Sequence, residues 1–441
     1  MTEATIHFPR GFLWGTATAA HQVEGNNTNN QWWAWEQVDG HIKNGDKSGL
    51  ACDWWGGRWK EDLDRAVETG QNAHRFSIEW SRVQPAPDRW DEDALERYRT
   101  ILRGMLERGL MPMITLHHFS NPMWLEEQGG WENDETPQKF DVFVRRTVAA
   151  LKEYGSYWVT INEPNVYAYS GYSEGAFPPG KKDINAAFHV MTNLVMGHAR
   201  AFHAIHEIQP EARVGLALNY RSFLASSASP LDKLIAGVQS AIFNDLFPRA
   251  AQDGKIRFLF KTIRVPEAAG TQDFLGVNYY SRDLVSFDVS RVSTLFGRLY
   301  YPKDADLSAT GFIANLPEGF FEALKWGLQF KVPMLVTENG VEDADDTLRP
   351  RYIAGHIQQM WRAVNFNWPV KGYFHWSLVD NFEWERGWTQ RFGLWGLDME
   401  TQARIRRPSV DLYAAICKEN GLSSDMVAKY CPEALPKIFP D

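Results

Sequence analysis

The chain has 441 residues and a formal net charge of −9, and it lacks a block of basic residues, which disfavours nucleic acid or an anionic membrane surface as a partner. Its three scattered cysteines cannot form a disulfide framework, and no CxxC or HExxH spacing indicates a zinc site. No apolar run reaches the roughly 18 residues of a membrane span, and the first residues lack the pattern of a secretion signal, so we expect a soluble, reduced, cytoplasmic protein.

Eight short apolar runs alternate along the chain with longer amphipathic stretches, the pattern of strands alternating with helices. The runs cover residues 12–17, 73–78, 113–116, 158–161, 214–218, 274–277, 334–336 and 373–375. Residues 91–110 repeat apolar side chains at helical spacing and end near Gly109. Further along, Thr136 and Pro137 predict the N-cap and first residue of a helix that lasts until Gly155.

This alternation predicts the fold class. Eight buried strands that alternate with helices favour a parallel sheet. Eight such units favour a closed barrel over an open doubly wound sheet, and the sequence lacks the GxGxxG turn of the dinucleotide-binding open sheet. We therefore predict an α/β fold: a single (β/α)8 TIM barrel over residues 1–441, with elaborated loops at the C-terminal face of the strands.

Reactive or aromatic side chains accompany six of the runs, toward the end where barrel enzymes carry their active sites. One polar residue after a strand is normally a cap or a turn, but six such strand ends on one rim exceed what turn chemistry needs. The residues are Arg75, His117, His118, Asn162, Glu163, Asn278, Tyr279, Tyr280, Glu338, Asn339 and Trp376.

Two of these strand ends place a glutamate between a β-branched run and a Pro or Gly turn: Glu163 in WVTINEP and Glu338 in LVTENG. Strands four and seven lie across the mouth of an eight-stranded barrel, so the two carboxylates can converge. Together with 19 Trp, whose flat faces suit sugar rings, the pair indicates acetal hydrolysis. Two alternatives stay open: a cap or surface ion pair, and a Mg²⁺ or Ca²⁺ site, although no cluster of hard-cation ligands surrounds either glutamate.

Six motifs together resemble glycoside hydrolase family 1, the β-glucosidases. They are FLWGTATAAHQVEG (12–25), HRFSIEWSR (74–82), WVTINEPN (158–165), FLGVNYY (274–280), VTENG (336–340) and HWSLVDNFEW (375–384). The resemblance implies a retaining exo-β-glycosidase that releases terminal β-D-glucosyl, β-galactosyl and β-fucosyl residues from cellobiose, other short oligosaccharides and aryl or alkyl glycosides, and that serves cellulose degradation. It implies no metal or organic cofactor, and a homo-oligomer is compatible with it.

The resemblance also implies residue roles. Glu163 looks like the general acid/base and Glu338 like the nucleophile, with Arg75 and Tyr280 flanking the nucleophile. Asn162 matches the residue that hydrogen-bonds the sugar 2-hydroxyl. Asn278 is grouped with the catalytic residues. The remaining sugar-binding positions are Gln22, His118, Glu383 and Trp384, which match the groups that hold the other hydroxyls, Trp376, which matches the platform under the ring, and Phe392, which matches the wall near C6.

These roles fit a simple electrostatic scheme. A guanidinium and a phenol beside Glu338 favour its anion. The negative charge of Glu338 then disfavours ionisation of Glu163 and keeps it protonated as an acid. When Glu338 forms an ester its charge disappears, and Glu163 loses its proton more readily, as a base must. We expect retention of configuration and carboxyl groups about 5–5.5 Å apart.

Three rival functions remain. A 6-phospho-β-glycosidase needs cations at the O6 end, where Glu383 would repel a phosphate and Arg386 is the only nearby cation of the motif. A transglycosidase shares the covalent intermediate but passes the sugar to another hydroxyl. A non-catalytic sugar-binding barrel would be signalled by loss of either carboxylate, and both Glu163 and Glu338 are present.

Several positions depart from the common family pattern, mostly on the leaving-group side, which puts aglycone preference in doubt. Phe119 stands where tryptophan is usual, WAWE at 33–36 replaces a frequent SIWD, and we expect residues 286–310 to form an irregular rim loop. Packing is the simpler explanation for His74, His117, His198, His203 and His206. The tryptophans at 32, 33, 35, 54 and 55 fit an entrance lining and loop packing equally well.

Overall fold

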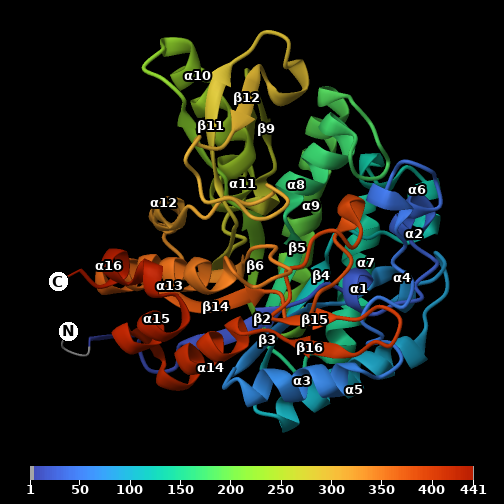
Figure 1. The fold of residues 1–441 in the computed structure, drawn as a ribbon. Helices are drawn as coiled ribbons and strands as arrows, with labels where there is room; N and C mark the ends of the chain where they lie inside the picture. The colour runs from blue at the N-terminus through green and yellow to red at the C-terminus, as the bar shows by residue number, and fades with distance from the viewer. Residues whose placement is uncertain (1–3, 441) are drawn as a thin grey trace.

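The computed structural model describes residues 4–440 and contains a closed barrel of eight parallel strands (Figure 1). Around the barrel the strands follow the order β10-β13-β14-β2-β3-β4-β5-β6. All eight predicted runs are confirmed, and most strands continue farther toward the rim than the apolar runs. The strands are β2 (Leu13–Ala17), β3 (Ala73–Ser77), β4 (Met111–His117), β5 (Tyr157–Asn162), β6 (Arg213–Asn219), β10 (Phe274–Tyr279), β13 (Met334–Asn339) and β14 (Val370–Trp376).

Helices surround the barrel in the ribbon view (Figure 1). The longer ones are α3 (Trp59–Glu68), α5 (Glu92–Glu107), α7 (Thr136–Leu151), α9 (Ile184–Ile208), α10 (Pro230–Ser240), α11 (Leu246–Asp253), α12 (Pro317–Gly327), α13 (Arg349–Asn365) and α14 (Ser409–Glu419). The shorter ones are α1 (Ala20–Val23), α2 (Gln31–Glu36), α4 (Trp80–Val83), α6 (Met123–Glu127), α8 (Pro164–Ala168), α15 (Ser424–Tyr430) and α16 (Leu435–Ile438). Among residues 4–440, no helix is both long and apolar enough to cross a membrane.

The two predicted helices are present, with one correction at a cap. Asp91 caps α5, since its side chain accepts a hydrogen bond from the backbone N–H of Ala94. Thr136, predicted as the N-cap of α7, is instead its first helical residue, and its hydroxyl donates to the carbonyl of Gly130. The prediction was wrong because the chain before Thr136 already turns: its N–H donates to the carbonyl of Asn133, and Glu135, with helical backbone angles, takes the flanking position.

Four smaller sheets lie outside the barrel. They pair β1 (Thr5–His7) with β17 (Gly421–Ser423), β8 (Lys255–Phe258) with β9 (Lys261–Arg264), β15 (Trp395–Leu397) with β16 (Arg404–Arg406), and β11 (Arg282–Phe287) with both β7 (Ser222–Ala225) and β12 (Gly297–Tyr300). The expectation of an irregular loop over 286–310 was therefore wrong in part. Val285 of β11 is fully buried against Ile235 and Ala236 of α10, and this small apolar cluster supports a sheet.

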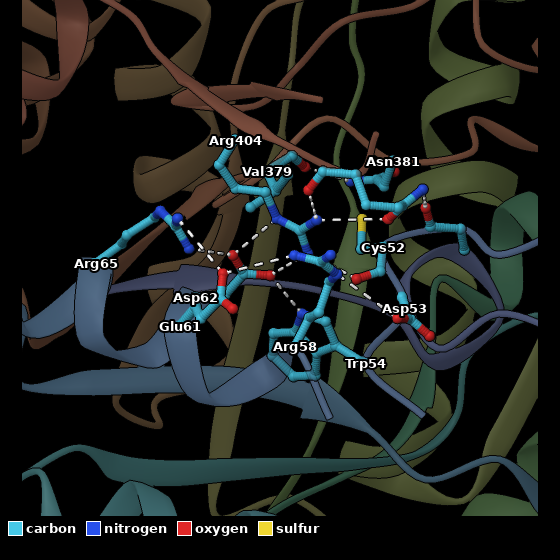
Figure 2. A network of polar contacts seen from close by, with 12 residues as sticks. Cys52, Asp53, Trp54, Arg58, Glu61, Asp62, Arg65, Val379, Asn381 and Arg404 are labelled. Atoms are coloured by element: carbon cyan, nitrogen blue, oxygen red, sulfur yellow. Dashed lines mark hydrogen bonds and ion pairs between the residues drawn. The ribbon is translucent and has the colours of Figure 1, made fainter. Parts of the chain in front are cut away.

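A buried polar network ties the C-terminal part of the chain to its N-terminal part (Figure 2). Arg404 of β16 donates to Asp62 of α3 at 2.8 Å and to the carbonyl of Cys52 at 2.6 Å. The indole of Trp54 donates to the same Asp62 oxygen at 2.8 Å. Neither charged side chain of the Arg404–Asp62 pair is exposed. Trp54 therefore packs a loop, as does Trp32, which is fully buried and donates to the carbonyl of Phe119.

Candidate active site

A pocket of about 860 Å³ opens at the C-terminal ends of the barrel strands. Both Glu163 and Glu338 line it, so the two glutamates predicted to converge do reach one cavity. The other predicted site residues that line the pocket are His118, Tyr280, Trp376, Glu383, Trp384 and Phe392. The remaining four, Gln22, Arg75, Asn162 and Asn278, are buried at its base or sides and hydrogen-bond to lining residues.

Glu338, near the end of β13, has charged and hydroxyl partners. Arg75 of β3 donates to its Oε1 at 2.6 Å, and the Tyr280 hydroxyl donates to its Oε2 at 2.6 Å. Arg75 is itself held by the Thr115 hydroxyl and by Asn162 Oδ1. Burial raises the pKa of Glu338 above its usual value, while Arg75 and Tyr280 act in the opposite direction and favour the anion. The expected influence of both partners is present, but burial outweighs it.

Glu163 follows β5 and has neutral partners. Its φ of 43° lies in the left-handed region, and Pro164 then begins α8, so the side chain leaves the strand at a sharp turn. Asn278 of β10 donates to Glu163 Oε1 at 2.8 Å, and Asn219 of β6 donates to the same oxygen at 3.0 Å. Burial, followed by the negative charge of Glu338, raises the pKa of Glu163 to about 8. The predicted direction of this shift is confirmed.

The part of the pocket around Gln22 and His118 is buried and presents amide, imidazole and carboxyl groups. Gln22 donates to Asn381, to the carbonyl of Phe382 and, at 3.2 Å, to Glu383. Burial raises the pKa of Glu383 well above its usual value, and the nearby Glu385 and Glu338 add to the shift. This end of the pocket can therefore both donate to and accept from hydroxyl groups.

The His118 ring is nearly parallel to two indoles, with ring centroids 5.9 Å from Trp376 and 6.0 Å from Trp384. Asn162 Oδ1 accepts from Arg75 and Asn278, so its amide nitrogen faces His118 Nε2 at 3.1 Å. Nε2 is then the acceptor and Nδ1 carries the proton. Burial, with Arg75 next, lowers the pKa of His118 well below its usual value, so the ring is neutral. Nδ1 is buried with no partner among residues 4–440 and is free to donate to a ligand.

Three residues of this network were missed from the sequence. Asn219 ends β6, the fifth barrel strand along the chain, where the apolar run VGLAL followed by Asn is the signal that points to it. Thr337 donates to Asn278 Oδ1 at 2.6 Å, and Thr115 accepts from Arg75 at 3.1 Å. The last two carried no signal, because a threonine inside a β-branched strand reads as ordinary strand composition.

The histidines read as structural have structural partners. His74 lies between the hydroxyls of Thr16 and Thr18, and His117 contacts Asn121. Three of the four histidines of α9 face separate groups: His198 contacts Thr160 and the carbonyl of Thr271, His203 the carbonyl of Glu267, and His206 Asp273. Within the described part of the chain, no three His, Cys, Asp or Glu side chains are placed to hold a metal ion.

A parallel eight-stranded barrel whose mouth holds two buried carboxylates in one aromatic and polar pocket is the arrangement of a glycoside hydrolase. The model of glycosyl hydrolase family 1 matches residues 4–422, and the chain belongs to this family.

Individual relatives agree with this assignment. The chain is 33% identical to β-glucosidase A of Thermotoga maritima, over 94% of this chain and 98% of that protein. It superposes on a β-glycosidase from Pyrococcus horikoshii with a TM-score of 0.91 and 34% identity, covering 97% of this chain and 98% of that one. A Thermotoga maritima β-glucosidase in complex with galacto-hydroximolactam superposes with a TM-score of 0.88 and 32% identity, covering 95% and 100%.

Proposed function

We propose that the chain is an exo-acting β-glucosidase that releases terminal non-reducing β-D-glucosyl residues, and also β-galactosyl and β-fucosyl residues, from cellobiose, other short oligosaccharides and aryl or alkyl glycosides. The relative named β-glucosidase A and the β-glucosidase solved with a galacto-type ligand support this range. The observation that carries the proposal is that Glu163 and Glu338 line one pocket but have different partners.

In the first step Glu338 is the nucleophile and Glu163 the acid. A carboxylate oxygen of Glu338 bonds to C1 while the bond from C1 to the glycosidic oxygen breaks, and Glu163 gives its proton to that oxygen. Arg75 and Tyr280 hold Glu338 in place and favour its anion in a buried site. With a pKa of about 8, Glu163 carries the required proton at neutral pH.

In the second step water replaces the leaving group. Glu163, now a carboxylate, takes a proton from water, the water oxygen bonds to C1, and the ester to Glu338 breaks, which restores the Glu338 anion and the protonated acid. Esterification removes the charge of Glu338, one of the causes that raise the pKa of Glu163. Two inversions at C1 give a product with retained configuration, as is general for family 1.

The sugar ring fits the closed end of the pocket in this proposal. Gln22, His118 and Glu383 bind its outer hydroxyls, and Asn162 binds the 2-hydroxyl, where the hydrogen bond strengthens in the transition state. Trp384 contacts a further hydroxyl, Trp376 lies beneath the ring, and Phe392 forms the wall near C6. Gln22 and His118 are buried, which supports a blind end here that accepts only a chain terminus, and we therefore propose exo action.

The 6-phospho alternative is disfavoured by the groups around that end. Arg386, the nearby cation of the motif, already pairs with Glu385 at 3.3 Å and lies over the ring of Phe312 at 3.8 Å. Glu383 and Glu385 both line the pocket and present carboxyl groups, not cations, to a phosphate. A transglycosidase shares the same intermediate and differs only in which acceptor reaches it, so product analysis at high sugar concentration decides between water and sugar.

A panel of nitrophenyl β-glycosides, cellobiose and one 6-phosphoglycoside tests the proposal, with NMR of the first-formed sugar. We expect turnover of β-glucoside and cellobiose and a β-anomer as first product. The α-anomer would refute the double displacement, and turnover of the phosphorylated substrate alone would establish the 6-phospho alternative. Tight glucose binding without turnover of any β-glycoside would identify a non-catalytic binding barrel.

We also propose a cytoplasmic location and one domain over residues 1–441, and a homo-oligomer is compatible with both. The three cysteines, Cys52, Cys417 and Cys431, are buried and unpaired, which suits a reducing compartment. One apolar cluster joins side chains from Phe8 to Ile438, which supports a single domain. Cell fractionation and light scattering of the purified protein test the location and the assembly.

A further inference from the structure

One oxygen of Glu163 receives two amide donors. Asn278 Nδ2 lies 2.8 Å from Oε1, and Asn219 Nδ2 lies 3.0 Å from the same atom. Two N–H donors on one oxygen require that oxygen to be an acceptor, so it cannot carry the proton of the neutral acid. The proton must then sit on Oε2.

The barrel itself fixes this arrangement. Asn219 and Asn278 are direct register partners on the neighbouring parallel strands β6 and β10. The backbone N–H of Glu163 donates to the carbonyl of Ala217 at 2.7 Å, two residues before Asn219. The carbonyl of Asn219 in turn accepts from Asn165 of α8 at 2.7 Å. The turn that carries Glu163 is thus bound to β6 on both sides, at the carbonyl of Ala217 and at the carbonyl of Asn219.

The two amides differ in what else they contact. Asn278 also donates to Asn162 at 3.2 Å and accepts from Thr337, beside Glu338, so its loss would disturb both carboxylates. The side chain of Asn219 donates to Glu163 and, within residues 4–440, to no second group. Asn219 also lines the pocket. It is therefore the donor whose removal affects Glu163 alone.

We propose that Asn219 is a positioning residue that, together with Asn278, reserves the Oε2 atom of Glu163 for the proton that is exchanged with substrate and water. This inference rests on the acid/base role proposed for Glu163. In the first step the proton leaves Oε2 for the glycosidic oxygen, and the two amides stabilise the carboxylate that remains. In the second step the same oxygen takes the proton of water, while Oε1 keeps both donors.

Asn219→Leu, which keeps the size of the side chain and removes the donor, is the test variant. Hydrogen bonds to a carboxylate favour its charged form, so their loss raises the pKa of Glu163. We expect the alkaline limb of kcat/KM to move upward by about 0.5–1 pH unit, and kcat on 2,4-dinitrophenyl β-glucoside, where deglycosylation is slow, to fall about tenfold.

Azide provides a measurement that would not change if Asn219 had a purely structural role. Azide bonds to C1 of the glycosyl ester and displaces Glu338 without any proton transfer, so it does not need the base. We expect added azide to raise kcat of Asn219→Leu by about tenfold, with β-glucosyl azide as product, and to leave kcat of the unmodified enzyme within about twofold. An unchanged alkaline limb together with no azide response in a folded variant would overturn the inference.

Two controls separate the possible failures. Asn72→Leu removes an amide that accepts from Trp14 and donates to the carbonyl of Phe12 at the opposite end of the barrel, so it tests lost stability without loss of a Glu163 donor. Glu163→Gln tests the role on which the inference depends. If Glu163→Gln hydrolyses cellobiose normally, the proposed function fails. If it does not and Asn219→Leu behaves like Asn72→Leu, only the inference fails. Asn219→Asp, with the same shape, replaces the Leu variant if that variant does not fold.

Discussion

The two carboxylates at the barrel mouth have almost the same burial and quite different surroundings. Glu338 and Glu163 are 3% and 6% exposed. Glu338 is held by a guanidinium and a phenol, whereas Glu163 is held by two neutral amides and faces the charge of Glu338. Burial raises both pKa values, so burial does not distinguish them. Their partners distinguish them. The cation beside Glu338 favours an anion there, and that negative charge favours a proton on Glu163.

The largest expected effect comes from removing the carboxylate of Glu338, the proposed nucleophile. Glu338→Gly eliminates the atom that bonds to C1, and we expect hydrolysis to fall by at least about 10⁴-fold. Added azide or formate should restore turnover as a substitute nucleophile. Glu126→Gln, which changes a buried carboxylate whose partner is Asn121, is the matched control and should retain activity. Undiminished hydrolysis by Glu338→Gly would refute the role.

The next effect separates acid from nucleophile. Glu163→Gln cannot donate a proton to the leaving group, so we expect cellobiose hydrolysis to fall about 10²–10⁴-fold. Glycosylation by 2,4-dinitrophenyl glucoside should change far less, because that leaving group needs no proton. The measurement is the pre-steady-state burst with both substrates. Equal losses for both would contradict the acid assignment.

A smaller effect tests the partners of Glu338. Tyr280→Phe removes a donor that lowers the pKa of Glu338, so this pKa rises. Activity needs the anion and is lost as pH falls through that pKa, so the acidic limb of kcat/KM should move to higher pH, with an activity loss of about tenfold. Tyr279→Phe is the control, since that hydroxyl donates to the carbonyl of Leu316 outside the pocket. An acidic limb that moves equally in both variants would count against the pairing.

The smallest effect is on stability. The folded-state pKa of Glu163, about 8, exceeds the usual 4.5, so its stabilising contribution is complete below about pH 4.5 and is lost as pH rises through 8. Glu163→Gln keeps the neutral shape and avoids this loss. We expect its melting temperature to equal that of the unmodified enzyme near pH 5 and to exceed it by about 1–3 °C near pH 9. A constant difference across this range would contradict the shift.

The sequence predicts the barrel well because its strands are local features: each is a short, mostly apolar run between amphipathic stretches, and all eight are confirmed. The site residues could be nominated by motif, and Glu163 and Glu338 do line one pocket. Asn219 was missed although its strand was recognised, because no motif covered its end. The rim sheet of β7, β11 and β12 could not be predicted, since β7 and β11 pair residues 60 positions apart and only the packing of Val285 reveals the sheet.

The net shift of Glu338 is the other point that sequence reasoning could not supply. The motifs indicate that Arg75 and Tyr280 lie beside this carboxylate, and the expected influence on its charge is present. How deeply the residue is buried depends on the loops that close the pocket, such as those carrying Phe392 and Trp384. Burial is a property of the assembled fold. Whether burial or a charge partner has the larger effect on the pKa of Glu338 therefore emerges only from the structure.

Protonation of Glu163 is the property that most directly separates the acid/base from the nucleophile. Carbon-13 NMR of selectively labelled glutamate carboxyls, assigned with Glu163→Gln, would follow its titration in the free enzyme and in the enzyme whose Glu338 is esterified by a 2-fluoro glucoside. We predict a pKa near 8 in the free enzyme and a clearly lower value in the ester, because the charge of Glu338 has been removed. The same pKa in both forms, or a value near 4.5 in the free enzyme, would contradict the account.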